Sequence, residues 1–178
     1  MIGQFSLLSY LVPMLNEVSG IALTTIPWLL LVFGIGSTVG VLVGGRLSDW
    51  NMRAALVGIL VAQAATYGLV YFVSGNSILM SASVFLWGVV GFAFGAPAQA
   101  RILKWSSDAP NLASTLIPSA YNVGIALGAV GGSLLLSHGG AYQSLPLIGL
   151  AASILATGVA LTSIAAERST EAAPRPAE

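Results

Sequence analysis

The chain has 178 residues, of which 56% are hydrophobic and only 7% are charged, and its six basic and six acidic side chains give a net charge of zero. A soluble domain carries about 25% charged residues, so a water-soluble globular fold is excluded. Nucleic-acid binding is excluded as well, because six scattered cations cannot follow a phosphate backbone. The chain is expected to be an integral membrane protein whose surroundings are the lipid bilayer.

Residue types that carry catalysis or bind metals are scarce. The chain has no cysteine and a single histidine, His138, so it cannot form a thiolate site, and this lone histidine cannot make a metal cage by itself. No carboxylate pair lies in the apolar segments, and no serine stands in a glycine-framed elbow. We predict a protein that is not an enzyme, with no catalytic residues, no metal and no cofactor.

Charged residues are rare enough to mark where helices leave the membrane. Residues 18–45 and 54–100 carry no charge, and residues 109–166 carry only His138. Since one crossing takes about 20 residues, the two longer segments must each fold back once, at the small polar residues 74–77 and 137–140. We predict an all-α membrane domain over residues 1–166 with six transmembrane helices, at about 1–16, 27–45, 54–73, 78–99, 112–136 and 145–165.

The two ends of the chain differ from these regular spans. The first predicted helix gives only about 24 Å at 1.5 Å per residue, contains Gln4 and Pro13, and has no charged flank before it. We interpret it as a helix whose beginning is missing, either because the chain is part of a longer protein or because an internal methionine was taken as the start. Residues 167–178 are polar and are predicted to form a disordered cytoplasmic tail.

The basic side chains all fall on one side of this layout. They follow the second, fourth and sixth predicted helices, and the other three connections contain no lysine or arginine: Arg46, Arg53, Arg101, Lys104, Arg168 and Arg175. Basic residues accumulate on the cytoplasmic side of membrane proteins. Both chain termini are therefore expected to face the cytoplasm.

Glycines recur every four residues in the second and fifth predicted helices, and small residues at this spacing let membrane helices pack closely. Such a face either holds a static contact or lets the helices slide past each other, and the spacing leaves both possibilities open. The glycines concerned are Gly36, Gly40 and Gly44 in one helix and Gly124, Gly128 and Gly132 in the other.

No Asp, Glu, Lys or Arg lies inside a predicted span, so a cavity in this chain must be lined by uncharged polar residues. The same residues are suited to hydrogen bonds between helices or to anchoring at the membrane surface. Asn122 is the strongest candidate, because an amide buried in hydrocarbon without a partner is unfavourable. The candidates are Gln4, Ser9, Tyr10, Ser37, Thr38, Gln63, Tyr67, Tyr71, Trp87, Gln99, Tyr121 and Asn122.

One predicted loop is more specific. Gly45-Arg46-Leu47-Ser48-Asp49, followed by Arg53, resembles the G-x-x-x-D-R-x-G-R signature of the major facilitator superfamily, with Trp50 and Met52 departing from it. Further stretches resemble the C-terminal half of bacterial arabinose-efflux and drug:proton antiporter permeases. These stretches are Tyr10-x-x-Pro13, Pro97-x-Gln99-x-Arg101, residues 109–113 (APNLA), and Tyr121-Asn122-x-Gly124-x-Ala126-x-Gly128.

The resemblance implies that the six predicted helices are helices seven to twelve of a bacterial inner-membrane transporter. Such a transporter binds a small-molecule substrate between two six-helix halves that rock for alternating access, so a matching N-terminal half is the expected partner. The implied activity is efflux of small organic solutes such as sugars or drugs in exchange for protons. The coupling carboxylate usually lies in the N-terminal half. The substrate-cavity candidates are Tyr10, Trp87, Gln99 and Asn122.

The resemblance also implies a gating role for the loop of Gly45, Asp49 and Arg53. The Asp49 carboxylate can face the positive N-terminal end of a helix in the other half and hold the cytoplasmic side closed. The alternative is a local ion pair between Asp49 and Arg53, four residues apart. For the whole chain, the alternatives are a non-transporting remnant, a membrane partner subunit that docks through its glycine faces, and a homodimer that rebuilds a two-half pore.

Overall fold

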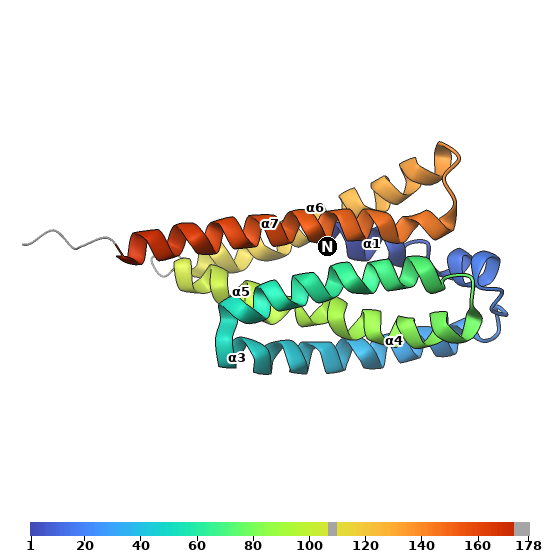
Figure 1. Cartoon of the computed structure of the whole chain (residues 1–178), viewed down its shortest axis with the longest axis horizontal. Helices are drawn as coiled ribbons and strands as arrows, with labels where there is room; N and C mark the ends of the chain where they lie inside the picture. The colour runs from blue at the N-terminus through green and yellow to red at the C-terminus, as the bar shows by residue number, and fades with distance from the viewer. Residues whose placement is uncertain (107–109, 173–178) are drawn as a thin grey trace, which may run out of the picture.

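The computed structural model describes residues 1–106 and 110–172, which form a bundle of helices with no strand among them (Figure 1). The elements are α1 (Ile2–Leu8), α2 (Leu11–Pro13), the π-helical turn η1 (Met14–Val18), α3 (Ile26–Val73), α4 (Ser77–Ala93), α5 (Gly95–Trp105), α6 (Pro110–Ser137), the 3₁₀ turn η2 (Tyr142–Ser144) and α7 (Leu145–Ala172).

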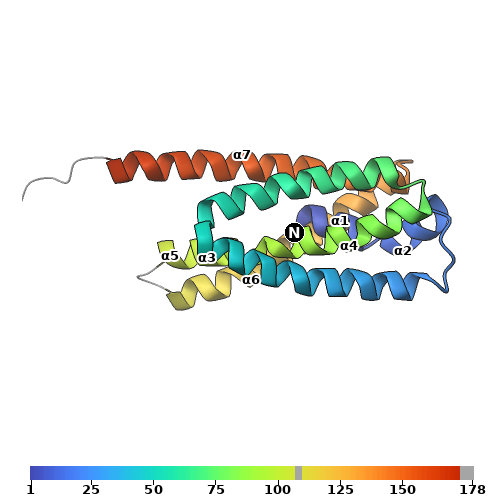
Figure 2. The ribbon, with the colours of Figure 1, turned by 60° about the horizontal axis from the view of Figure 1, so that its bottom comes forward.

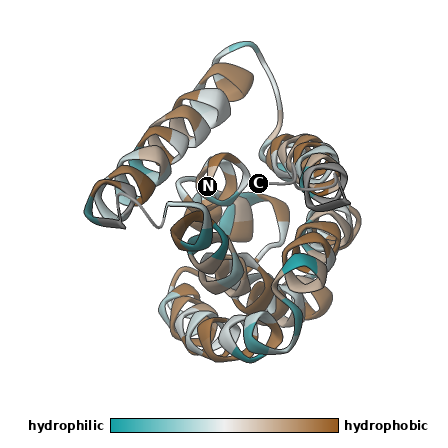
Figure 3. Ribbon diagram, turned by 90° about the vertical axis from the view of Figure 1, so that its left-hand side faces the viewer, coloured by the Kyte–Doolittle hydropathy of each residue, from teal (hydrophilic) through white to brown (hydrophobic). Residues whose placement is uncertain are grey.

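Four helical segments within the described residues are long and apolar enough to cross a membrane. They are Ile26–Val73, Ser77–Trp105, Ser114–Ser137 and Tyr142–Glu167. The outward faces of these helices carry large apolar side chains, and Figure 3 shows apolar colour around the outside of the bundle as well as inside it. Trp28, Phe72 and Leu155 are each more than 60% exposed, as a lipid-facing surface requires.

The second and third predicted helices are the two arms of α3, which meet at a sharp kink without a longer loop between them. α3 has 48 residues, which corresponds to about 72 Å of helix, and it bends at Asn51, whose φ of −157° and ψ of 95° are not helical. The Asn51 Oδ1 accepts a hydrogen bond from Ala54 N at 3.0 Å and so caps the helix that follows. The two arms, 26–50 and 52–73, fold back alongside each other (Figures 1 and 2).

The first predicted helix is broken into α1, α2 and η1. Pro13 has no amide hydrogen to donate to the carbonyl of Ser9, and the backbone at Tyr10 leaves the helical region, with φ −119° and ψ 15°. α1 begins about halfway along the bundle, where the N-terminus lies in Figure 1. A single helix over 1–16 is therefore absent.

Two more boundaries differ from the prediction. The fourth predicted helix is interrupted at Phe94, between α4 and α5, and α5 continues to Trp105. Pro97 has no amide hydrogen to donate to the carbonyl of Ala93, four residues before it. α7 continues to Ala172, so the polar segment from Glu167 to Ala172, expected to be disordered, is helical, and Glu167 is buried. Residues 173–178 of the predicted tail lie outside the described residues.

Both predicted tight turns occur in the structure. Asn76 caps α4, because its Oδ1 accepts from Ile78 N and Leu79 N at 3.1 and 3.0 Å. Gly139 adopts a φ of +85° after α6, and Gly140 N donates to Leu135 O at 2.9 Å. These turns lie at one end of the bundle, and the bend of α3 and the ends of α5 and α7 lie at the other (Figure 1).

The predicted glycine faces lie at two helix contacts. Gly36, Gly40 and Gly44 of the first arm of α3 face the backbone of α4, and a Cβ added to Gly40 would overlap Val89. Gly124, Gly128 and Gly132 of α6 face the segment 1–10 in the same way. Small residues thus let the backbones approach at both contacts.

Candidate functional site

An accessible cavity of about 500 Å³ lies between α1, the first arm of α3, α4, α5 and α6. None of its lining side chains is charged. Its polar lining side chains come from three of these helices: Gln4, Gln99, Tyr121 and Asn122. Phe5, Phe92 and Ile125 supply apolar walls. Such a cavity can bind an uncharged solute by apolar contact and a few directed hydrogen bonds.

Two of the four predicted cavity residues meet in this cavity. Gln99 of α5 and Asn122 of α6 are both exposed, and neither amide makes a hydrogen bond within the described structure. The Tyr121 hydroxyl beside Asn122 is buried and has no hydrogen-bond partner there. Three polar groups with unused hydrogen-bonding capacity therefore line one space.

The other two predicted cavity residues lie elsewhere. The Trp87 side chain is 2% exposed, and its ring centroid is 4.7 Å from that of Phe33 on α3. Tyr10 donates a hydrogen bond from its hydroxyl to Ala129 O at 3.2 Å, and its ring covers Gly132. Both side chains therefore join helices instead of lining the cavity.

The predicted gating residues lie around the bend of α3. Asp49 is exposed and has no ion-pair partner among the described residues, while Gly45 faces open space. Arg53 lies on the second arm and pairs with Glu167, its Nε standing 3.3 Å from Glu167 Oε2. The local pair between Asp49 and Arg53 is not formed, because the bend at Asn51 takes the two residues off a common helix.

Glu167 links three helices at this end of the bundle. Its carboxylate accepts from Arg53 of the second arm of α3 and from Nη2 of Arg101 on α5, and the same Nη2 is 2.8 Å from Ser163 Oγ. The three charged side chains are 26%, 13% and 10% exposed for Arg53, Arg101 and Glu167. Sequence reasoning missed this cluster, although all three residues follow apolar spans on the same predicted side of the membrane.

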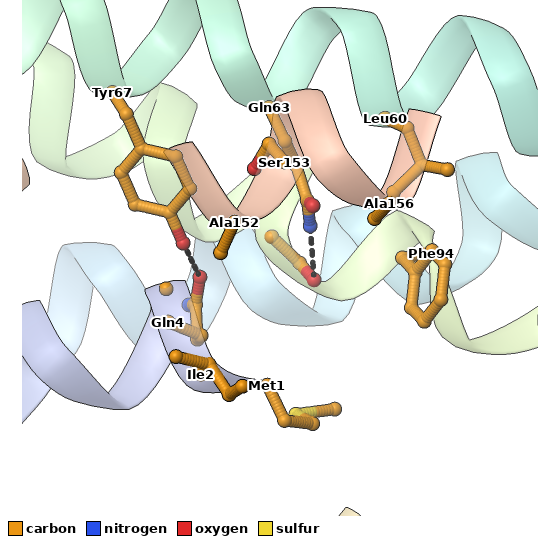
Figure 4. A pocket seen from close by; sticks show the side chains of 12 residues that line it. Met1, Ile2, Gln4, Leu60, Gln63, Tyr67, Phe94, Ala152, Ser153 and Ala156 are labelled. Carbon is orange, nitrogen blue, oxygen red and sulfur yellow. Dashed lines mark hydrogen bonds between the residues drawn. The ribbon is translucent and has the colours of Figure 1, made fainter. Parts of the chain in front are cut away.

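A smaller pocket of about 170 Å³ lies between α1, the second arm of α3, α4 and α7 (Figure 4). The Tyr67 hydroxyl donates to Gln4 Oε1 at 3.2 Å, and Gln63 Nε2 donates to Gly91 O at 3.3 Å. We refer to it as the inner pocket and to the 500 Å³ space as the central cavity.

Comparison with known proteins matches the whole chain, residues 1–178, to the model of the Major Facilitator Superfamily. An inner membrane transport protein of Escherichia coli K12, YdhP, is 30% identical over 147 residues, which are 83% of this chain and 38% of that protein. A probable sugar efflux transporter of Helicobacter pylori 26695 is 30% identical over 134 residues, 75% of this chain and 34% of the relative. The chain thus spans well under half the length of these relatives.

Proposed function

We propose that this chain, which belongs to the major facilitator superfamily, is the C-terminal six-helix half of a secondary transporter of the bacterial inner membrane. The transporter would export small organic solutes, such as sugars or drugs, by alternating access and in exchange for protons. The observation that carries the proposal is the central cavity, which has no charged side chain in its lining and in which Gln99 and Asn122 present unpaired amides.

Six membrane crossings are supported by the course of the chain. The two arms of α3, the pair α4–α5, α6 and α7 each run along the bundle, and α1 to η1 supplies a broken sixth segment (Figure 2). Arg46 and Arg53 flank the bend of α3, and Arg101 and Lys104 end α5, so these cations lie at one end of the bundle (Figure 1). This asymmetry supports a cytoplasmic location for that end of the bundle, where α7 also ends, whereas Met1 lies about halfway along the bundle (Figure 1).

No charged side chain lines the central cavity. The part of the substrate that contacts this half of the transporter is therefore expected to be uncharged. Aromatic and aliphatic walls contribute apolar contact, and the amides contribute donors and acceptors that suit hydroxyl or carbonyl groups. A matching N-terminal half would cover this face and bring the ionisable group needed for proton coupling.

Replacing Asn122 with leucine in the transporter that contains this chain is expected to lower efflux about fivefold, a loss of roughly 1 kcal/mol of binding, mainly by raising KM. The change removes an amide that contacts the solute while keeping a similar side-chain volume. Efflux of radiolabelled sugars and of a fluorescent drug from preloaded cells measures it. Gln143→Leu, an exposed amide outside the cavity, is the control. Equal rates for Asn122→Leu and wild type with every compound would contradict the proposal.

Replacing Asp49 with asparagine is expected to reduce transport severalfold and to leave folding unchanged. Asp49 is exposed and unpaired within the described residues, so its charge is available to the N-terminal end of a helix in the other half. Efflux rates and the thermal unfolding midpoint of the purified protein are measured together, with Glu17→Gln as an exposed-carboxylate control. Unchanged efflux would leave Asp49 without a gating role.

A further inference from the structure

The inner pocket contains hydrogen-bonding groups that the protein itself does not satisfy. Gln4 is 5% exposed, and its Oε1 accepts from Tyr67 while its Nε2 is buried without a partner. The amide of Gln4 lies against Gly91, where any Cβ would come within 2.6–2.9 Å of its terminal atoms. The amide is therefore held in place from two sides, Gln4 lines the pocket, and its unused donor is buried beside it (Figure 4).

Two further polar groups line the same pocket. Gln63 donates through Nε2 to Gly91 O, which leaves its Oε1 to accept a hydrogen bond. The Ser153 hydroxyl of α7 makes no hydrogen bond within the described structure. One unpaired donor, one acceptor and one hydroxyl thus border a single space, with Leu60, Phe94 and the alanines of α7 as its apolar walls.

The size of the inner pocket suits water. At about 30 Å³ for each molecule, a space of 170 Å³ has room for a small cluster. Apolar cavities stay empty, whereas polar cavities that offer two to four partners hold ordered water. Met1, Gln4 and Gly91 line both the inner pocket and the central cavity, so the two spaces adjoin.

We propose that the inner pocket is a binding site for a cluster of ordered water molecules. One of them accepts from Gln4 Nε2, and others donate to Gln63 Oε1 and exchange hydrogen bonds with Ser153. The cluster lies within this half of the protein, between α1 and α7, and it completes the hydrogen bonding of a polar contact that would otherwise be unsatisfied. This inference does not depend on which solute the protein transports.

Brief X-ray radiolysis in H₂¹⁸O tests the proposal, because bound water then yields hydroxyl radicals that modify the nearest side chains. Tyr67 is the reporter, since it is 2% exposed yet lines the pocket. Met14, fully buried in the apolar core, is the internal reference. In membrane-embedded protein, mass spectrometry should find ¹⁸O on Tyr67 at least about fivefold faster than on Met14. Equal protection of both residues, or oxygen that is not ¹⁸O, would overturn the proposal.

Variants show whether the polar groups hold the water. Gln4→Leu and Gln63→Leu remove the donor and the acceptor with little change in volume, and each should lower the labelling of Tyr67 severalfold. Gln99→Leu removes an amide that lines only the central cavity and should leave Tyr67 labelling unchanged. Two variants are used so that, if one of them does not fold, the other still tests the proposal. Wild-type labelling of Tyr67 in both variants would refute a water site built by these side chains.

Discussion

Replacing Gly40 with leucine is expected to prevent stable folding of the chain in the membrane. A Cβ at this position would overlap the backbone of Val89, and backbone cannot move aside as the end of a flexible side chain can. The first arm of α3 and α4 would have to separate along a contact that also includes Gly36, Gly44 and Gly88. Overpacking of this kind costs about 3 kcal/mol or more, and close packing is the main force that joins helices in lipid.

The yield of monodisperse protein after detergent extraction, together with its thermal unfolding midpoint, measures this effect. Gly34→Leu is the matched control, since Gly34 lies on the same arm, is exposed and has nothing within 4 Å of an added Cβ. The control should fold as well as wild type. Recovery of folded Gly40→Leu at wild-type yield would show that the tight contact with α4 does not determine stability.

Replacing Glu167 with glutamine is expected to lower the unfolding midpoint by about 4–8 °C, which corresponds to roughly 2 kcal/mol for a chain of this length. The change removes a carboxylate that joins Arg53 and Arg101 and places a neutral amide against these two largely buried guanidinium groups. The second arm of α3, α5 and α7 would lose their common contact at this end of the bundle. Exposed ion pairs contribute much less, but these side chains are at most 26% exposed.

A double-mutant cycle separates this pair from general effects of charge. Arg101→Gln, Glu167→Gln and the double variant are compared by thermal unfolding, and coupling of about 1–2 kcal/mol is expected. Glu17→Gln, an exposed carboxylate at the other end of the bundle, should not change the midpoint. Additive effects of the two substitutions would show that the ion pair stabilises nothing.

Much of the framework follows from the positions of charges, turns and glycines. Both turns occur where small polar residues interrupt the apolar segments, and the described cations lie at the end of the bundle that the charge pattern indicates. The sharpness of the turn at residue 51 was not predicted. Residues 46–53 were expected to form a connection between two helices, but they are helical on both sides of the single non-helical residue Asn51. The break near Pro13 could have been expected from the missing amide hydrogen, although its π-helical form could not.

The candidate cavity shows a different limit. Asn122 and Gln99 meet in one cavity, whereas Trp87 packs on Phe33 and Tyr10 covers Gly132. All four residues stand in apolar spans with similar neighbours along the chain, so composition does not separate them. What distinguishes them is which face of each helix points to the cavity, and that depends on how the helix packs against its neighbours.

The sequence by itself determined that the protein is helical and belongs in a membrane, because uncharged apolar segments of about 20 residues or more satisfy their backbone hydrogen bonds in lipid as helices. It also determined which ends of the helices lie together. Only the tertiary structure decided which faces meet, so that Gln4 reaches Tyr67 and Glu167 reaches two arginines. The reason is physical: lipid-facing and buried faces are both apolar here, so the periodicity that marks the inner face of a soluble helix is missing.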